Sequence, residues 1–144
     1  MIEQDTVRLL RECDAGAKMG VESFEDVLGR VDKKELRDLL SAAKEDHEGL
    51  ERQVRAQLDR CQDDGKEPSA MASAMSHMKT QMEMMLDPSD AKIADLMTDG
   101  CNMGIKSLSK YLNQYEAADE SSKNLAKKLI SMEETLVGRL RPYL

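Results

Sequence analysis

The sequence predicts an all-α protein, a bundle of four long helices arranged as two repeated antiparallel hairpins, with a short fifth helix in the crossover. Three observations predict this fold class. Helix-favouring residues dominate a chain of 144 residues that has 3 prolines and 3% aromatic residues. Apolar residues recur at alternating steps of three and four, the spacing of one helix face. The second half of the chain also repeats the first.

The repeat relates residues 19–24 (MGVESF) to residues 103–108 (MGIKSL), a displacement of 84 positions (103 − 19). Gly16 and Gly100 keep the same displacement. Two copies of one helical hairpin predict a single bundle domain over residues 1–144, with internal pseudo-symmetry and equivalent positions facing a common centre. Gly16 with Gly20, and Gly100 with Gly104, form one pair in each copy. Glycines inside helices are unfavourable, so the two pairs predict close helix approach or a gap that accommodates a ligand.

The first hairpin is expected over residues 5–62. Asp5 is a suitable N-cap for a helix that runs to about Val31, and Asp32 is expected to cap the next helix. So short a connection between two long helices predicts antiparallel packing. The inward stripe of the second helix is Leu36, Leu40, Ala43, His47, Leu50, Val54 and Leu58.

A polar break at residues 63–68 (DDGKEP) separates the hairpins and contains both turn-forming residue types. A crossover helix is expected over residues 69–86, and the second hairpin over residues 88–141, with Asp87 as the cap and Pro88 at the first helical position. The crossover helix carries a stripe of methionines, namely Met71, Met75, Met78, Met82 and Met85.

Composition and charge argue against several partners. The net charge of −7 would repel nucleic acid, and no apolar run approaches the roughly 20 residues of a membrane span. The N-terminal residues show no export signal. The three cysteines, Cys13, Cys61 and Cys101, are an odd number without a CxxC pair. We therefore expect a cytoplasmic protein with reduced thiols that binds neither nucleic acid nor membrane.

The repeat also points to the middle of the bundle. Metal sites in bundles are built from carboxylates on two helices and Glu-x-x-His motifs on the other two. Residues 44–47 (KEDH) align with residues 133–136 (EETL), so His47 and Glu133 each represent half of such a motif. Asp14 is the candidate carboxylate on the first helix, and its mate in the other copy is a threonine. This donor set is too small for a di-iron centre.

The simpler interpretation of His47 is a buried core histidine that requires a hydrogen-bond partner. Asp14 on the first helix, or Glu51 one turn along its own helix, is the expected partner. Cys13 and Cys101 lie within helices, away from the helix N-termini that lower a thiol pKa, so they are expected to be unreactive.

The chain resembles the ferritin-like superfamily. In particular, it is similar to a bacterial family of four-helix bundles with an Asp-Gly-x-x-Gly pattern in the first helix and a histidine in the second. Asp99 and Gly100 with Gly104, His47 and the turn at residues 65–68 carry the resemblance, which covers nearly the whole chain. It implies a cytoplasmic bacterial bundle, often without an assigned activity. The departures are an alanine where the first helix of that family has the aspartate, and the incomplete Glu-x-x-His pairs.

Three hypotheses about function follow. The first is a non-catalytic bundle, a homodimer without a cofactor, that serves as a structural or protein-interaction module with an unidentified protein partner. The second is a metal-binding protein, with copper on the methionine stripe beside His77 or with a single transition metal ion in the core. The core ligands would be His47, Glu133, Asp14 and Cys101. The third is a small apolar ligand held between helices where glycines leave space.

Overall fold

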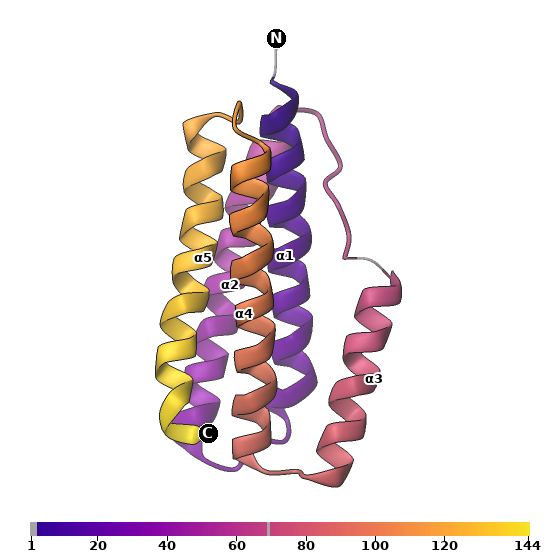
Figure 1. Ribbon diagram of the computed structural model, residues 1–144, viewed down its shortest axis with the longest axis vertical. Helices are drawn as coiled ribbons and strands as arrows, with labels where there is room; N and C mark the ends of the chain where they lie inside the picture. Colours follow the sequence, from indigo (N-terminus) through magenta and orange to yellow (C-terminus); the bar gives the residue numbers. More distant parts are fainter. Residues whose placement is uncertain (1–2, 69) are drawn as a thin grey trace.

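The computed structural model describes residues 3–68 and 70–144, and the side chains of these residues except 70–72 and 74. It is a helical bundle without strands in the described residues, which confirms the predicted all-α class (Figure 1). The elements are α1 (Gln4–Leu28), α2 (Lys34–Arg60), α3 (Ala70–Leu86), α4 (Asp90–Gln114), α5 (Glu120–Leu140) and the 3₁₀ turn η1 (Arg141–Tyr143). Among the described helices, none combines the length and the apolar character needed to cross a membrane.

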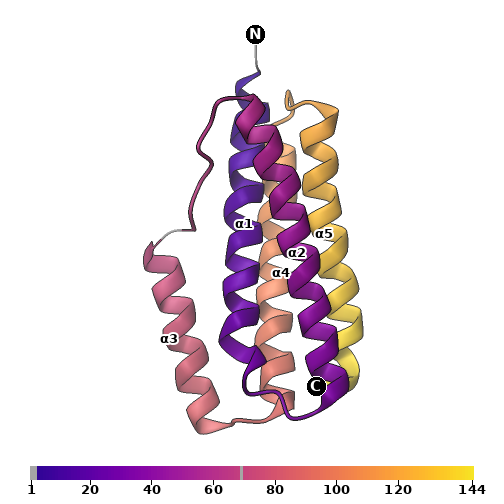
Figure 2. The same cartoon turned by 180° about the vertical axis from the view of Figure 1, so that it is seen from behind.

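The four long helices form two antiparallel hairpins, α1 with α2 and α4 with α5 (Figures 1 and 2). The hairpins pack side by side, so that α1 contacts α4 and α2 contacts α5. After α2 the chain returns along the outside of the bundle, and α2 and α4 therefore run in the same direction. The shorter helix α3 lies outside the four-helix core and contacts α1 and α4.

The apolar core is divided into two clusters. The cluster around Leu10 and Leu129 fills the half of the bundle near the N-terminus. The cluster around Phe24 and Leu136 fills the opposite half. The inward stripe predicted for the second helix contributes to both clusters, and the residues between the clusters form the candidate site described below.

The ends of α1 differ from those predicted. Its N-cap is Glu3 rather than Asp5, and its last helical residue is Leu28 rather than Val31. The carboxylate of Asp5 instead accepts a hydrogen bond from the backbone nitrogen of Ala117, at 3.1 Å. This aspartate therefore ties the start of α1 to the loop between α4 and α5.

The caps predicted for α2 and α4 are also wrong. The N-cap of α2 is Lys33, without a side-chain hydrogen bond. The backbone nitrogens of Asp32 and Lys33 donate instead to the carboxylate of Asp90, each at 2.9 Å. The cap of α4 is Ser89 rather than Asp87. A carboxylate of α4 thus fixes the turn before α2, whereas Ser89 caps its own helix by accepting a hydrogen bond from the backbone nitrogen of Lys92 at 3.1 Å.

Candidate functional site

The middle of the bundle, between the two apolar clusters, contains a histidine and a glutamate that are almost completely buried. His47 of α2 is 2% exposed and Glu133 of α5 is 6% exposed. Nε2 of His47 lies 3.7 Å from Oε1 of Glu133, and Nδ1 donates to the carbonyl oxygen of Ala43 at 2.8 Å. The edge of the imidazole packs against Phe24, with ring centroids 5.0 Å apart. The other carboxylate oxygen, Oε2 of Glu133, has no hydrogen-bond partner among the described residues.

Two glycines related by the repeat make room for this pair. A Cβ at Gly20 of α1 would lie 2.8 Å from Cδ2 of His47. A Cβ at Gly104 of α4 would overlap Oε2 of Glu133 and lie 2.9 Å from its Cδ. Gly100, by contrast, faces open space. Each long helix therefore contributes one residue to a central polar layer, with a glycine on α1 and α4 and a polar side chain on α2 and α5. The close approach predicted at Gly20 and Gly104 is an approach of these side chains to the glycines.

Burial dominates the electrostatics of this layer. It raises the pKa of Glu133, while the hydrogen bond and charge of His47 act in the opposite direction. Burial, and then the charge of Glu133, raise the pKa of the Cys101 thiol to about 12. Burial also raises the pKa of Cys13 to about 12. Both thiols are therefore protonated at neutral pH and are poor nucleophiles.

The four predicted metal ligands do not meet at one point. His47 and Glu133 are paired, whereas Asp14 lies in a separate network nearer the N-terminal end of the bundle. Within residues 3–68 and 70–144, no group of three or more His, Cys, Asp and Glu side chains is placed to hold a metal ion. The partner predicted for His47 is also wrong, because Asp14 and Glu51 interact with each other.

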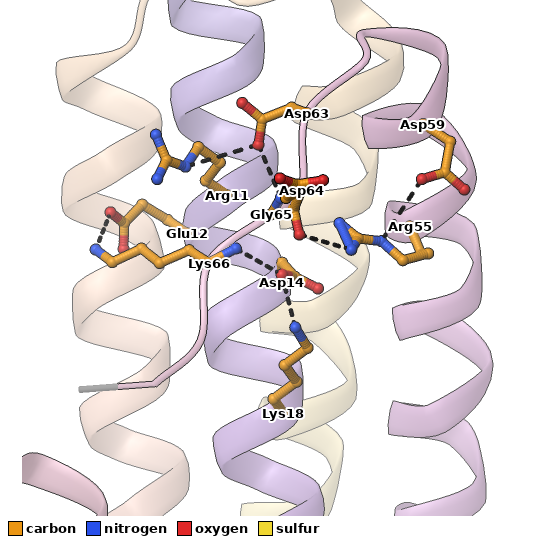
Figure 3. A network of polar contacts seen from close by, with 10 residues as sticks. All are labelled: Arg11, Glu12, Asp14, Lys18, Arg55, Asp59, Asp63, Asp64, Gly65 and Lys66. Carbon is orange, nitrogen blue, oxygen red and sulfur yellow. Dashed lines mark hydrogen bonds and ion pairs between the residues drawn. The ribbon is translucent and has the colours of Figure 1, made fainter. Parts of the chain in front are cut away.

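Asp14 anchors the crossover loop to α1 (Figure 3). Its side chain is fully buried, and its Oδ2 accepts hydrogen bonds from Nζ of Lys18 at 3.0 Å and from the backbone nitrogen of Lys66 at 2.8 Å. The loop backbone comes this close because Gly65 has φ +84°, a left-handed conformation that glycine adopts readily. A Cβ at Gly65 would overlap both Asp14 and Arg55.

Three further contacts hold the same loop against the first hairpin (Figure 3). They are Lys66 Nζ with Glu12 at 2.7 Å, Arg55 Nη1 with the carbonyl oxygen of Asp64 at 2.7 Å, and Arg11 Nε with Asp63 at 3.8 Å. The loop is thus fixed on both helices of the hairpin.

Glu51 of α2 is the half-buried partner of Asp14 and lines a groove between α1 and α2. Burial, followed by a hydrogen bond and repulsion from Asp14, raises the pKa of Glu51 to about 8. Burial also acts to raise the pKa of Asp14, but hydrogen bonds from Glu51, Lys66 and Lys18 outweigh it and hold that pKa below its usual value. At neutral pH the two carboxyl groups therefore share one proton, which stays with Glu51.

The helix α3 is bound to α1 through its polar side. Three contacts, each about one helical turn from the next, join α3 to α1 and to Arg30, which lies just after the end of α1. They are Ser73 Oγ with Glu22 at 3.1 Å, His77 Nδ1 with Asp26 at 2.9 Å, and Gln81 Oε1 with Arg30 at 2.5 Å. One apolar side chain, Met84, is 2% exposed and joins the core cluster around Phe24.

The opposite side of α3 presents apolar side chains to solvent. We call Met75, Met78, Met82 and Met85 the methionine face; they are 64%, 65%, 63% and 83% exposed. The adjacent Leu86 is 82% exposed, and Met71 lies outside the described side chains. His77 was expected beside this stripe but contacts α1 on the other side of the helix. Because they are so exposed, these methionines do not pack within their own bundle.

Compared with protein-family models, with curated proteins and with solved structures, the chain gives no match. What its side chains can do is therefore argued from their own geometry and chemistry.

Replacing Gly20 should test the central layer. Gly20→Ala is expected to lower the free energy of unfolding by about 1–3 kcal/mol, because the added Cβ meets an imidazole held on two sides. Gly100→Ala is the matched control, since its Cβ meets nothing within 4 Å. The free energy of unfolding of that variant should rise by about 1 kcal/mol, because alanine favours the helix more than glycine does. Urea unfolding gives both values, and a gain in both variants would contradict the predicted clash.

A double-mutant cycle tests the His47–Glu133 pair. His47→Leu leaves a buried carboxylate without its partner and should cost about 3 kcal/mol at neutral pH. The double variant His47→Leu/Glu133→Leu should be more stable than the sum of the single variants predicts, by about 1 kcal/mol or more. Additive effects in urea unfolding would show that the two side chains do not interact.

The Asp14–Glu51 pair predicts a pH dependence. Because the folded pKa of Glu51 is raised to about 8, its contribution to stability is fully present below the unfolded value near 4.5 and is lost as pH rises through about 8. Glu51→Gln removes this loss. Its stability relative to the native chain should rise by about 1 kcal/mol between these two pH values, after allowance for solvent screening in the groove. Glu48→Gln, in the same groove, is the control, and an equal rise in both variants would refute the pairing.

Proposed function

We propose that this chain is a non-catalytic, ferritin-like helical bundle that forms a homodimer through the methionine face of α3 and acts as a structural or protein-interaction module. One observation carries the proposal: α3 turns its polar side toward the bundle and its methionines toward solvent. The two hairpins joined by a long crossover support the comparison with ferritin-like bundles.

The exposed apolar surface supplies the driving force for association. Each methionine of the face exposes more than three-fifths of its surface, and Leu86 extends the patch at the end of the helix. Burying a side chain of this size contributes about 1.5–3 kcal/mol. A stable interface of standard size buries about 800 Å² on each partner, and a continuous helix face is a natural centre for one. Contiguous exposed patches of this kind mark interaction sites.

Charge favours a second copy of the same chain as the partner. The chain carries a net charge of −7, whereas α3 contains one lysine and one glutamate, Lys79 and Glu83. These two residues pair with each other at 3.9 Å. Two copies of α3 can therefore meet about a two-fold axis without bringing like charges together. A helix that binds a membrane surface is normally rich in lysine and arginine on its polar side, and α3 is not.

The central layer supports a role without catalysis. His47 and Glu133 lie between the two apolar clusters and are 2% and 6% exposed, so the pair itself presents almost no surface to a substrate, although His47 borders a pocket between α2 and α5 that Lys128 and Thr135 also line. The thiols of Cys13 and Cys101 are buried and protonated. All three cysteines are free, which is consistent with the cytoplasmic location, in a bacterial cell, that the sequence predicts.

Negative charges introduced on the methionine face should abolish the dimer. The native chain is expected to be dimeric at micromolar concentration, and Met78→Glu/Met82→Glu should weaken association at least tenfold, because four carboxylates would be forced together. Met103→Glu is the matched control, since Met103 is 70% exposed on α4 and outside the face. Sedimentation equilibrium measures association, and circular dichroism checks that all variants fold. A native chain that is monomeric, or a control that also dissociates, would refute the proposed interface.

A further inference from the structure

The methionine face differs in composition from the core of the same protein. The buried residues of α2 and α5 are mainly leucines, and the buried methionines of the described core are Met84 and Met97. Leucine would supply the same apolar surface with less flexibility and equal helix propensity. The chain therefore places thioethers on the surface of α3 and branched aliphatic side chains where burial stabilises the fold. Hydrophobic packing alone does not account for sulfur at these positions.

The spacing of the methionines brings their sulfur atoms within reach of one another. Positions 75, 78, 82 and 85 are separated by three, four and three residues, so each lies one turn from the next on a single side of α3. Side chains at this spacing have Cβ atoms about 5–6 Å apart, and the three rotatable bonds of methionine let neighbouring sulfurs converge. In the single chain, exposure of more than three-fifths of each side chain leaves that movement free.

Other donors on α3 are turned away from this face or engaged. His77 binds Asp26 on the side of α3 that contacts α1. Lys79 and Glu83 pair with each other, and Glu83 also contacts Lys92 of α4 at 3.6 Å. The donor set offered to solvent along Met75, Met78, Met82 and Met85 is consequently made of neutral thioethers.

Neutral thioether sulfur is a soft ligand that selects Cu(I) over harder divalent ions, which prefer carboxylate, water or imidazole. We propose that successive thioethers of the methionine face, centred on Met75, Met78 and Met82, bind a Cu(I) ion. This inference goes beyond the proposed function, because it requires the sulfur atoms themselves, whereas dimer formation requires only apolar surface.

The test is an anaerobic titration of the full-length chain with Cu(I) in competition with a chromogenic Cu(I) chelator. A partly exposed thiol would compete for the metal, so each protein carries Cys61→Ser. The expected result is about one Cu(I) per chain with sulfur-only ligation in X-ray absorption. Met75→Leu/Met78→Leu/Met82→Leu should lose at least tenfold in affinity, while Met103→Leu and His77→Ala should bind as before.

The leucine variant separates this proposal from the dimer interface. It keeps an apolar face, so sedimentation equilibrium should still show a dimer while Cu(I) binding is lost. A dimer that never takes Cu(I) from the chelator, or a leucine variant that binds it equally well, overturns the copper site and leaves the interface standing. A monomeric native chain that binds Cu(I) through sulfur overturns the interface and supports the copper site.

Discussion

The burial of His47 beside Glu133 is the constraint on which the register of the four long helices depends. Around the pair, α1 and α4 each supply a glycine, and any larger residue there would overlap the imidazole or the carboxylate. A slip of α2 against α5 by a turn would separate the two side chains and leave a buried carboxylate unpaired, which costs several kcal/mol. The apolar clusters above and below are less selective, because hydrophobic attraction is non-directional. The clusters supply most of the stabilisation, and the polar layer selects the register.

A second buried carboxylate has a different task. Asp14 binds the backbone of Lys66 and thereby holds the crossover loop against α1, while Gly65 allows the approach. Its partner Glu51 keeps a proton at neutral pH, so only one negative charge is buried at this point. The ladder of contacts with α1 sets which side of α3 faces inward.

The sequence predicts those features that arise from local spacing. The periodic stripes give the helices, the inward position of His47 and the hairpins, and the repeat picks out Gly20 and Gly104. Features that depend on a distant partner were not accessible in this way. Asp14 was expected to face the centre, but its Oδ2 accepts a hydrogen bond from the backbone of a loop more than fifty residues away. Asp32 was expected to cap α2, yet α2 has no side-chain cap, and a carboxylate of α4 binds the backbone nitrogens of Asp32 and Lys33 before the helix begins.

The orientation of α3 decides what the surface of this protein can do. With the methionine face turned inward, the same residues would add to the core, and Ser73, His77 and Gln81 would face water. Two anchors oppose that rotation: Met84 enters the core at one end, and the polar ladder occupies the side next to α1. Rotation would bury one apolar face but would strip the ladder of its partners, with carboxylates of α1 left against thioethers. The residues that determine the exposed surface therefore lie on the hidden side of α3.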